Sequence, residues 1–113
     1  MKRILLTALC VAGLMFSVTA CNSQDVSRDA IRKNFPAAQH DKAIAVAQCE
    51  SGLNPQAVSP GGGNWGLFQI NKVHQGMVER MGYRWDQITD PYVNSKVARV
   101  LFDQSGWRPW SCA

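Results

Sequence analysis

Glu50 is the residue of this chain best suited to acid–base chemistry. It is the only acidic residue between Asp41 and Glu79, and it stands at the expected end of an apolar helix. A glycine-rich turn follows, and then residues 64–71, which supply aromatic and amide side chains. Cleavage of a glycosidic bond needs an acid that protonates the leaving oxygen, and a glutamic acid does this when its surroundings disfavour the charged form. We therefore predict a glycan-cleaving site at Glu50; the alternative is an ordinary solvated glutamate.

The elements that must position Glu50 are expected to be helices. A helix that starts with Asp41 as its capping residue would end near Glu50, because Gly52 can adopt the positive φ that follows a last turn. Asp90-Pro91 is typical of a helix start, and Gly106 of a helix end. The expected helices cover residues 27–35, 41–50, 73–81 and 91–105. Residues 67–71 could form one short strand at most, so the predicted class is mainly α.

Residues 1–20 are predicted to be a secretory signal peptide. A positive start is followed by an apolar run from Ile4 to Phe16 that is too short to span a membrane. Residues 18–21, Val-Thr-Ala-Cys, resemble a bacterial lipobox, which predicts cleavage before Cys21 and its lipidation. The alternative is ordinary cleavage after Ala20 and free secretion. The polar residues 22–27 would then form a short tether to a membrane.

Removal of residues 1–20 leaves a chain of 93 residues, enough for one modest core. Its ten Lys and Arg stand against eight Asp and Glu, a net charge of +2 without a basic stripe. This argues against nucleic acid as a partner, and we expect a monomer. The expected organisation is a signal peptide (1–20), a tether with a first helix (21–38) and a catalytic domain (39–113).

Cys49 and Cys112 are predicted to form a disulfide, since an exported chain leaves the reducing cytosol. Such a long closed loop would stabilise the fold by about 4 kcal/mol in the chain-entropy model. Two free thiols are the alternative. A zinc site is disfavoured because neither His40 nor His74 lies at ligand spacing from either cysteine, and no metal or other cofactor is expected.

An ordered series of residues resembles the catalytic core of the soluble lytic transglycosylases, within the lysozyme superfamily. The series runs through Glu50-Ser51, Asn54-Pro55, Ala57, Ser59-Pro60, a glycine stretch and residues 66–71, and extends to Asp90-Pro91, Asn94 and Gly106-Trp107. The triplet at 49–51 and the Trp107-x-x-Trp110 ending also look like small secreted lysozyme-like proteins. The resemblance implies a mainly helical fold like the core of goose-type lysozymes, with a short irregular or β-like segment and one disulfide. The glycine stretch is one residue longer than the common spacing.

The resemblance also implies the chemistry and the partner, peptidoglycan. Glu50 would protonate the bond between N-acetylmuramic acid and N-acetylglucosamine, then act as a base on the 6-hydroxyl of the muramic acid, which yields a 1,6-anhydro sugar without a second carboxylate. The residues expected to contact substrate are Ser51, Asn64, Trp65, Gln69, Asn71, Tyr92 and Asn94. Ser51 could instead be a plain helix-end hydroxyl, Trp65 a core residue, and Asn71 and Asn94 structural braces.

Two alternatives to a transglycosylase stay open at this point. A hydrolytic lysozyme on the same fold would need a second carboxylate, for which Asp86 and Asp90 are available. However, Asn64 stands about where animal-type lysozymes have an acidic residue, and an amide cannot serve as a base. The second alternative is an inactive glycan-binding or secretion-associated scaffold, which would not require an acid at Glu50. The protein is expected in the cell envelope or secreted.

Overall fold

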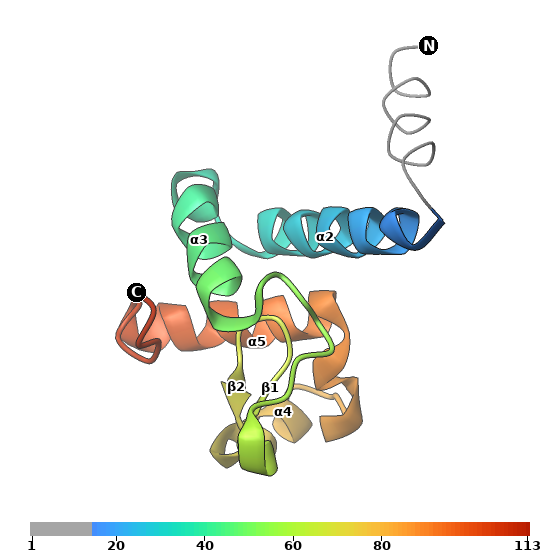
Figure 1. Cartoon of the computed structure of the whole chain (residues 1–113). Coiled ribbons are helices and arrows are strands. Elements are labelled where there is room, and N and C mark those ends of the chain that lie inside the picture. The colour runs from blue at the N-terminus through green and yellow to red at the C-terminus, as the bar shows by residue number, and fades with distance from the viewer. Residues whose placement is uncertain (1–14) are drawn as a thin grey trace.

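Helices carry most of the chain in the computed structural model, which describes residues 15–113 (Figure 1). The helices and strands are, in chain order, α2 (Met15–Asn34), α3 (His40–Ser51), β1 (Asn64–Trp65), β2 (Ile70–Asn71), α4 (Gln75–Arg80) and α5 (Pro91–Ser105). Single 3-10 turns lie at Ala37–Gln39, Pro60–Gly62, Lys72–His74 and Trp85–Thr89. The mainly α class and the short β-like segment are confirmed.

Helix α2 is longer than the sequence indicated. The predicted tether, residues 22–27, lies inside this helix, so the tether prediction is wrong. The polar residues form its outer face, since Gln24 and Asp25 are exposed, whereas Ser27 is fully buried and donates a hydrogen bond to the Leu53 carbonyl at 3.0 Å. Ala30 and Ile31 extend this buried face, which packs chiefly on α5.

Residues 1–14 of the predicted signal peptide lie outside the described residues, while its residues 15–20 and the predicted lipidation site, Cys21, lie in the first turns of α2. Within residues 15–113, no helix combines the length and apolar character needed to cross a membrane.

Most helix ends follow from local sequence. Asp90 caps α5 by accepting hydrogen bonds from the backbone N–H groups of Tyr92 and Val93, with Pro91 in the first turn. Gly52 ends α3 in the left-handed conformation, with φ 64° and ψ 30°. The N-terminus of α3 corrects the sequence analysis: the helix begins at His40, so Asp41 lies in the first turn instead of capping it. A carboxylate is still favourable there because of the helix dipole.

The core joins the helices to the C-terminal segment through aromatic rings. Phe35 from the end of α2 stacks on Trp107, with ring centroids 5.4 Å apart, and Phe68 meets Trp110 edge-on at 6.0 Å. Phe68 belongs to the loop that connects β1 to β2, and it is fully buried. The hairpin therefore has its connecting loop embedded in the core, together with Ile70 of β2. The strands pair antiparallel, with Asn64 opposite Asn71 and Trp65 opposite Ile70.

Tyr92 links α5 to α2 through a solvent-exposed contact. Its hydroxyl donates a 2.6 Å hydrogen bond to Asp29, and Lys33 lies 5.7 Å above its ring. This hydrogen bond, followed by the interaction of Asp29 with Lys33, holds the pKa of Asp29 below its ordinary value of 3.8. The same bond raises the pKa of Tyr92 above its ordinary value of 10.0.

We expect Tyr92→Phe to lower the melting temperature at those pH values at which Tyr92 and Asp29 are hydrogen-bonded in the wild type. The stability that Asp29 contributes is fully present above its unfolded pKa and is lost as pH falls through its lowered folded pKa. The stability that Tyr92 contributes is fully present below pH 10.0 and is lost as pH rises through its raised folded pKa. The difference in melting temperature between the wild type and Tyr92→Phe should be constant from about pH 5 to about pH 9 and should shrink outside this range. Melting curves across pH test this, with Tyr83→Phe as control; an equal difference at acid pH would contradict the assignment.

Candidate active site

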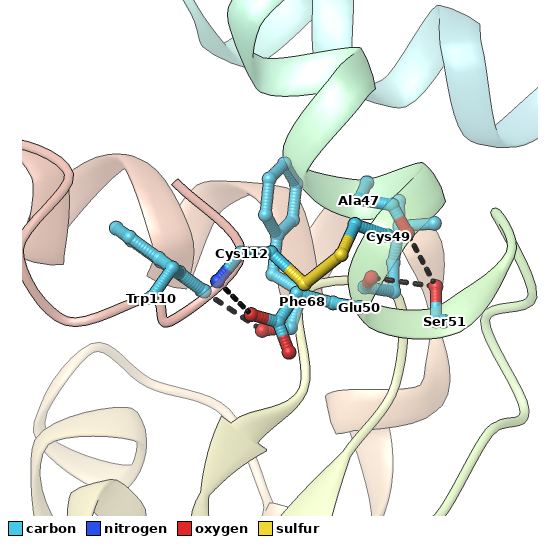
Figure 2. Close-up of a disulfide and its surroundings, with 8 residues drawn as sticks. Ala47, Cys49, Glu50, Ser51, Phe68, Trp110 and Cys112 are labelled. Carbon is cyan, nitrogen blue, oxygen red and sulfur yellow. Dashed lines mark hydrogen bonds between the residues drawn. A yellow bond between two sulfur atoms is a disulfide. The ribbon is translucent and has the colours of Figure 1, made fainter.

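Glu50 lies in the last turn of α3, half-buried, with its carboxyl group beside the C-terminal segment (Figure 2). Its Oε2 accepts a 3.4 Å hydrogen bond from the backbone N–H of Cys112. The side chain is therefore neither sealed in the core nor extended freely into solvent. One face of the carboxyl group is held by the protein while the group remains reachable from outside.

The disulfide between Cys49 and Cys112 positions that N–H group. The two Cα atoms lie 5.9 Å apart, and the bridge joins the residue before Glu50 to the C-terminal segment across 63 positions of sequence. The predicted pairing is confirmed. Figure 2 shows the bridge lying directly beside the Glu50 side chain. The covalent link thus brings the acid and its backbone donor together.

The loop between β1 and β2 is hydrogen-bonded to both segments that flank Glu50. Trp110 is 6% exposed, and its indole N–H donates a 2.9 Å hydrogen bond to the carbonyl of Phe68 (Figure 2). Ser51, the residue after the acid, lies within hydrogen-bonding distance of the Leu67 carbonyl at 2.7 Å and the Ala47 carbonyl at 3.1 Å. These bonds fasten the loop to both α3 and the C-terminal segment.

Ser51 therefore holds the loop in place. Its hydroxyl has one proton to donate, and both nearby partners are backbone carbonyls rather than the Glu50 carboxyl group. The structure supports the interpretation of Ser51 as a helix-end hydroxyl with a positioning role. Its contact with substrate stays a prediction.

Asn94 corrects the predicted set of substrate-contacting residues. Its side chain is 0% exposed, so it cannot touch a glycan. The amide nitrogen donates to the carbonyls of Trp65 at 3.0 Å and Ile88 at 2.9 Å, and the amide oxygen accepts from the N–H of Phe68 at 2.8 Å. From the first turn of α5, Asn94 acts as the structural brace that the sequence analysis gave as an alternative.

Gln69 ends the same loop in a left-handed conformation, with φ 50°. Its side chain is half-buried, and the amide nitrogen donates to the carbonyls of Ala57 at 3.1 Å and Gly66 at 3.0 Å. The amide group is therefore fixed in orientation by the backbone around it. Its contact with substrate stays a prediction, and a fixed amide is consistent with it.

Asn64, Trp65 and Asn71 of the two strands are at least partly exposed, whereas Ile70 is buried. Asn71 donates from its side-chain nitrogen to the side-chain oxygen of Asn64 at 3.0 Å and accepts from the N–H of Val73. Trp65 is half-buried, donates its indole N–H to Gly62 and meets Trp85 edge-on. Substrate contacts at Asn64, Trp65 and Asn71 stay predictions.

Tyr92, the remaining predicted substrate contact, is used elsewhere. Its hydroxyl and ring contact Asp29 and Lys33 of α2, so the structure assigns it to the packing of α2 on α5. The two acids considered as a second carboxylate are also engaged: Asp90 caps α5, and Asp86 pairs with Arg84 at 3.0 Å. Within residues 15–113, no group of three or more His, Cys, Asp or Glu side chains is arranged to hold a metal ion.

Sequence reasoning missed two groups around Glu50 that the structure identifies. The backbone N–H of Cys112 contacts the acid, and the carbonyl of Phe68 accepts from Trp110. Neither carries a side-chain signature, because both are main-chain atoms whose positions depend on tertiary packing. The predicted Cys49–Cys112 disulfide and the Trp107-x-x-Trp110 ending are the sequence signals that this segment folds back.

A family model described as the transglycosylase SLT domain matches residues 31–105. The chain belongs to this family. The SLT domain is lysozyme-like and implies peptidoglycan as substrate, which agrees with the resemblance noted in the sequence. The matched segment begins within α2 and ends with α5, so the C-terminal segment that carries Trp107, Trp110 and Cys112 lies outside it. Comparisons with curated proteins and with solved structures find no significant match.

We expect Gly66→Ala to destabilise the fold far more than Gly82→Ala. Both glycines have positive φ, 79° and 96°, so both substitutions introduce backbone strain of about 1–2 kcal/mol. At Gly66, however, a Cβ would overlap the Asn94 amide and lie 2.8 Å from the Ile88 carbonyl, whereas nothing lies within 4 Å at Gly82. Urea unfolding should show a loss of about 4 kcal/mol for Gly66→Ala. Equal losses for both variants would mean that Asn94 does not confine the loop.

The double variant Cys49→Ala/Cys112→Ala should lose about 4 kcal/mol of unfolding free energy, because the bridge closes a loop of 63 positions. Urea denaturation of the oxidised wild type, the reduced wild type and the variant measures the difference. The reduced protein should match the variant, and a reducing agent should leave the variant unchanged. A loss below about 1 kcal/mol would show that the C-terminal segment docks without the bridge.

Proposed function

We propose that this protein is a lytic transglycosylase that cleaves the β-1,4 bond between N-acetylmuramic acid and N-acetylglucosamine with Glu50 as its single catalytic carboxyl group. Family membership supports a peptidoglycan-cleaving glycosidase in general. The observation that carries the specific proposal is the position of Glu50, accessible on one side and held on the other by the Cys112 N–H.

In the first step, protonated Glu50 gives its proton to the glycosidic oxygen as the bond to the anomeric carbon breaks. The N-acetylglucosamine side leaves as an alcohol, and positive charge develops on the muramic acid ring. The Cys112 N–H fixes Oε2, which leaves Oε1 to meet the substrate. In the second step, the Glu50 carboxylate takes the proton of the 6-hydroxyl while that oxygen bonds to the anomeric carbon. The product is a 1,6-anhydro sugar, and Glu50 is protonated again.

A single-acid route is consistent with the surroundings of Glu50. Asn64 supplies an amide at the hairpin, and Asp86 and Asp90 are engaged in structural interactions. A hydrolase would need a carboxylate or a positioned water on the far face of the sugar. In the proposed route the 6-hydroxyl of the muramic acid attacks the anomeric carbon, so neither a second carboxylate nor a positioned water is needed.

We further propose that the protein is exported and anchored to a membrane through lipidated Cys21. Cleavage before Cys21 would leave residues 21–26, the part of α2 that precedes the buried Ser27, as a helical spacer of about 9 Å at a rise of about 1.5 Å per residue. A helix would hold the catalytic domain at a more defined distance from the membrane than a flexible tether. Radiolabelled lipid incorporation that persists in Cys21→Ser would contradict this assignment.

Glu50→Gln should abolish cleavage of purified peptidoglycan, with a rate at least about 100-fold below wild type, because the amide can neither donate nor accept the required proton. Glu79→Gln is the matched control, since Glu79 is an exposed acid on α4. Mass spectrometry of the wild-type products should find 1,6-anhydromuramic ends. Reducing ends alone would indicate a hydrolytic lysozyme, and wild-type activity in Glu50→Gln would exclude Glu50 as the acid.

A further inference from the structure

A pocket of about 380 Å³ lies next to the candidate active site, between the first half of α3 and the C-terminal segment. It is lined by Lys42, Trp107, Arg108, Trp110 and Ala113. The two indole rings provide apolar surface, and the two basic side chains provide positive charge. No Asp or Glu side chain lines it. Glu50 is not part of the lining, so this is a site separate from the catalytic carboxyl group.

The two basic side chains of this pocket have no acidic partner among residues 15–113. The ion pairs in this part of the chain join Lys33 to Asp29, Arg84 to Asp86, and Arg99 to Asp103. Lys42 and Arg108 are both exposed, and Arg108 makes only a long 3.4 Å hydrogen bond to the Ser105 carbonyl. Within the described part of the chain, Lys42 and Arg108 form no ion pair, and together they outweigh the one main-chain carboxylate of the lining, that of Ala113. Two such basic side chains beside two aromatic rings favour a ligand with carboxylate groups and apolar segments.

Trp110 connects this pocket to the active site. Its ring lines the pocket, while its indole N–H is bonded to the Phe68 carbonyl beside Glu50 (Figure 2). Ala113 of the lining directly follows Cys112, whose N–H contacts Glu50. Lys42 and Glu50 are eight positions apart on α3, which corresponds to about 12 Å along the helix axis. The pocket thus extends from the segment beside Glu50 toward Lys42, which lies about 12 Å from the acid along the axis of α3.

We propose that this pocket binds the acidic peptide stem that branches from the glycan strand of peptidoglycan. This inference rests on the proposed function, since it assumes that a muramic acid unit lies at Glu50. An extended peptide covers about 3.3–3.6 Å per residue, so three to four stem residues span the distance from Glu50 to Lys42. The stem carboxylates pair with Lys42 and Arg108, and the peptide's aliphatic portions pack on Trp107 and Trp110. Lys42 lies within the residues that the family model matches, and the C-terminal part of the lining lies outside them.

Binding of the free tripeptide L-Ala-γ-D-Glu-meso-diaminopimelate tests the pocket independently of catalysis. In nitrogen-15 NMR titrations of the wild-type protein, we expect the Trp107 and Trp110 indole signals to shift saturably. Lys42→Ala/Arg108→Ala should weaken the affinity at least about tenfold, whereas Arg80→Ala/Lys96→Ala, which removes the same charge from exposed positions on α4 and α5, should not. Shifts confined to other residues, or equal affinities in all three proteins, would overturn the proposal.

Cleavage rates on two substrates then separate this inference from the proposed function. The quantity to compare is the cleavage rate of glycan strands that carry peptide stems divided by the rate of strands without them. This ratio should fall about tenfold in Lys42→Ala/Arg108→Ala and stay at the wild-type value in Arg80→Ala/Lys96→Ala. An unchanged ratio would overturn the pocket assignment even if anhydro products form. Failure of the wild type to cleave either substrate would contradict the proposed function, while the tripeptide titration would still decide the pocket.

Discussion

The side chain of Asn94 supplies the hydrogen bonds on which the candidate site depends. It pairs with two carbonyls and one N–H of the backbone, all close to the turn between β1 and β2. Buried main-chain groups without partners cost about 1–3 kcal/mol each, so a fully buried amide that satisfies three of them is difficult to replace. Gly66 is part of the same arrangement, because only a residue without a Cβ lets the loop pass so close to Asn94. The loop can then receive Ser51 from α3 and Trp110 from the C-terminal segment.

Three segments far apart in the sequence meet at Glu50, and each is fixed by a different kind of interaction. The end of α3 carries the acid, the hairpin loop is held by hydrogen bonds, and the C-terminal segment is held by the disulfide and by Trp110. This arrangement explains how so short a chain can fix the position of the candidate catalytic carboxyl group without a large core. Rigid neighbours matter for catalysis because positioning of the reacting groups supplies much of the rate enhancement.

Features that depend on neighbouring residues in the sequence could be predicted. The Asp90-Pro91 helix start, the left-handed Gly52 after α3 and the disulfide follow from local backbone chemistry or from the small number of cysteines. The directions of side chains could not be predicted, because they depend on packing between segments. Asn94 therefore appeared as a substrate contact, although α5 turns it inward. Polar residues 22–27 suggested a tether because a short polar run is equally typical of a flexible segment and of the exposed face of a helix.

Hydrogen exchange of the Phe68 backbone amide tests most directly whether Asn94 confines the loop. This N–H is buried and bonded to the Asn94 side chain at 2.8 Å, not to another backbone group. If Asn94 holds the loop throughout the folded state, the Phe68 amide should exchange only through global unfolding, with a protection equal to that of the α5 amides. Exchange as fast as that of the exposed turn at residues 60–63 would show that the loop opens locally, and would contradict a fixed site around Glu50.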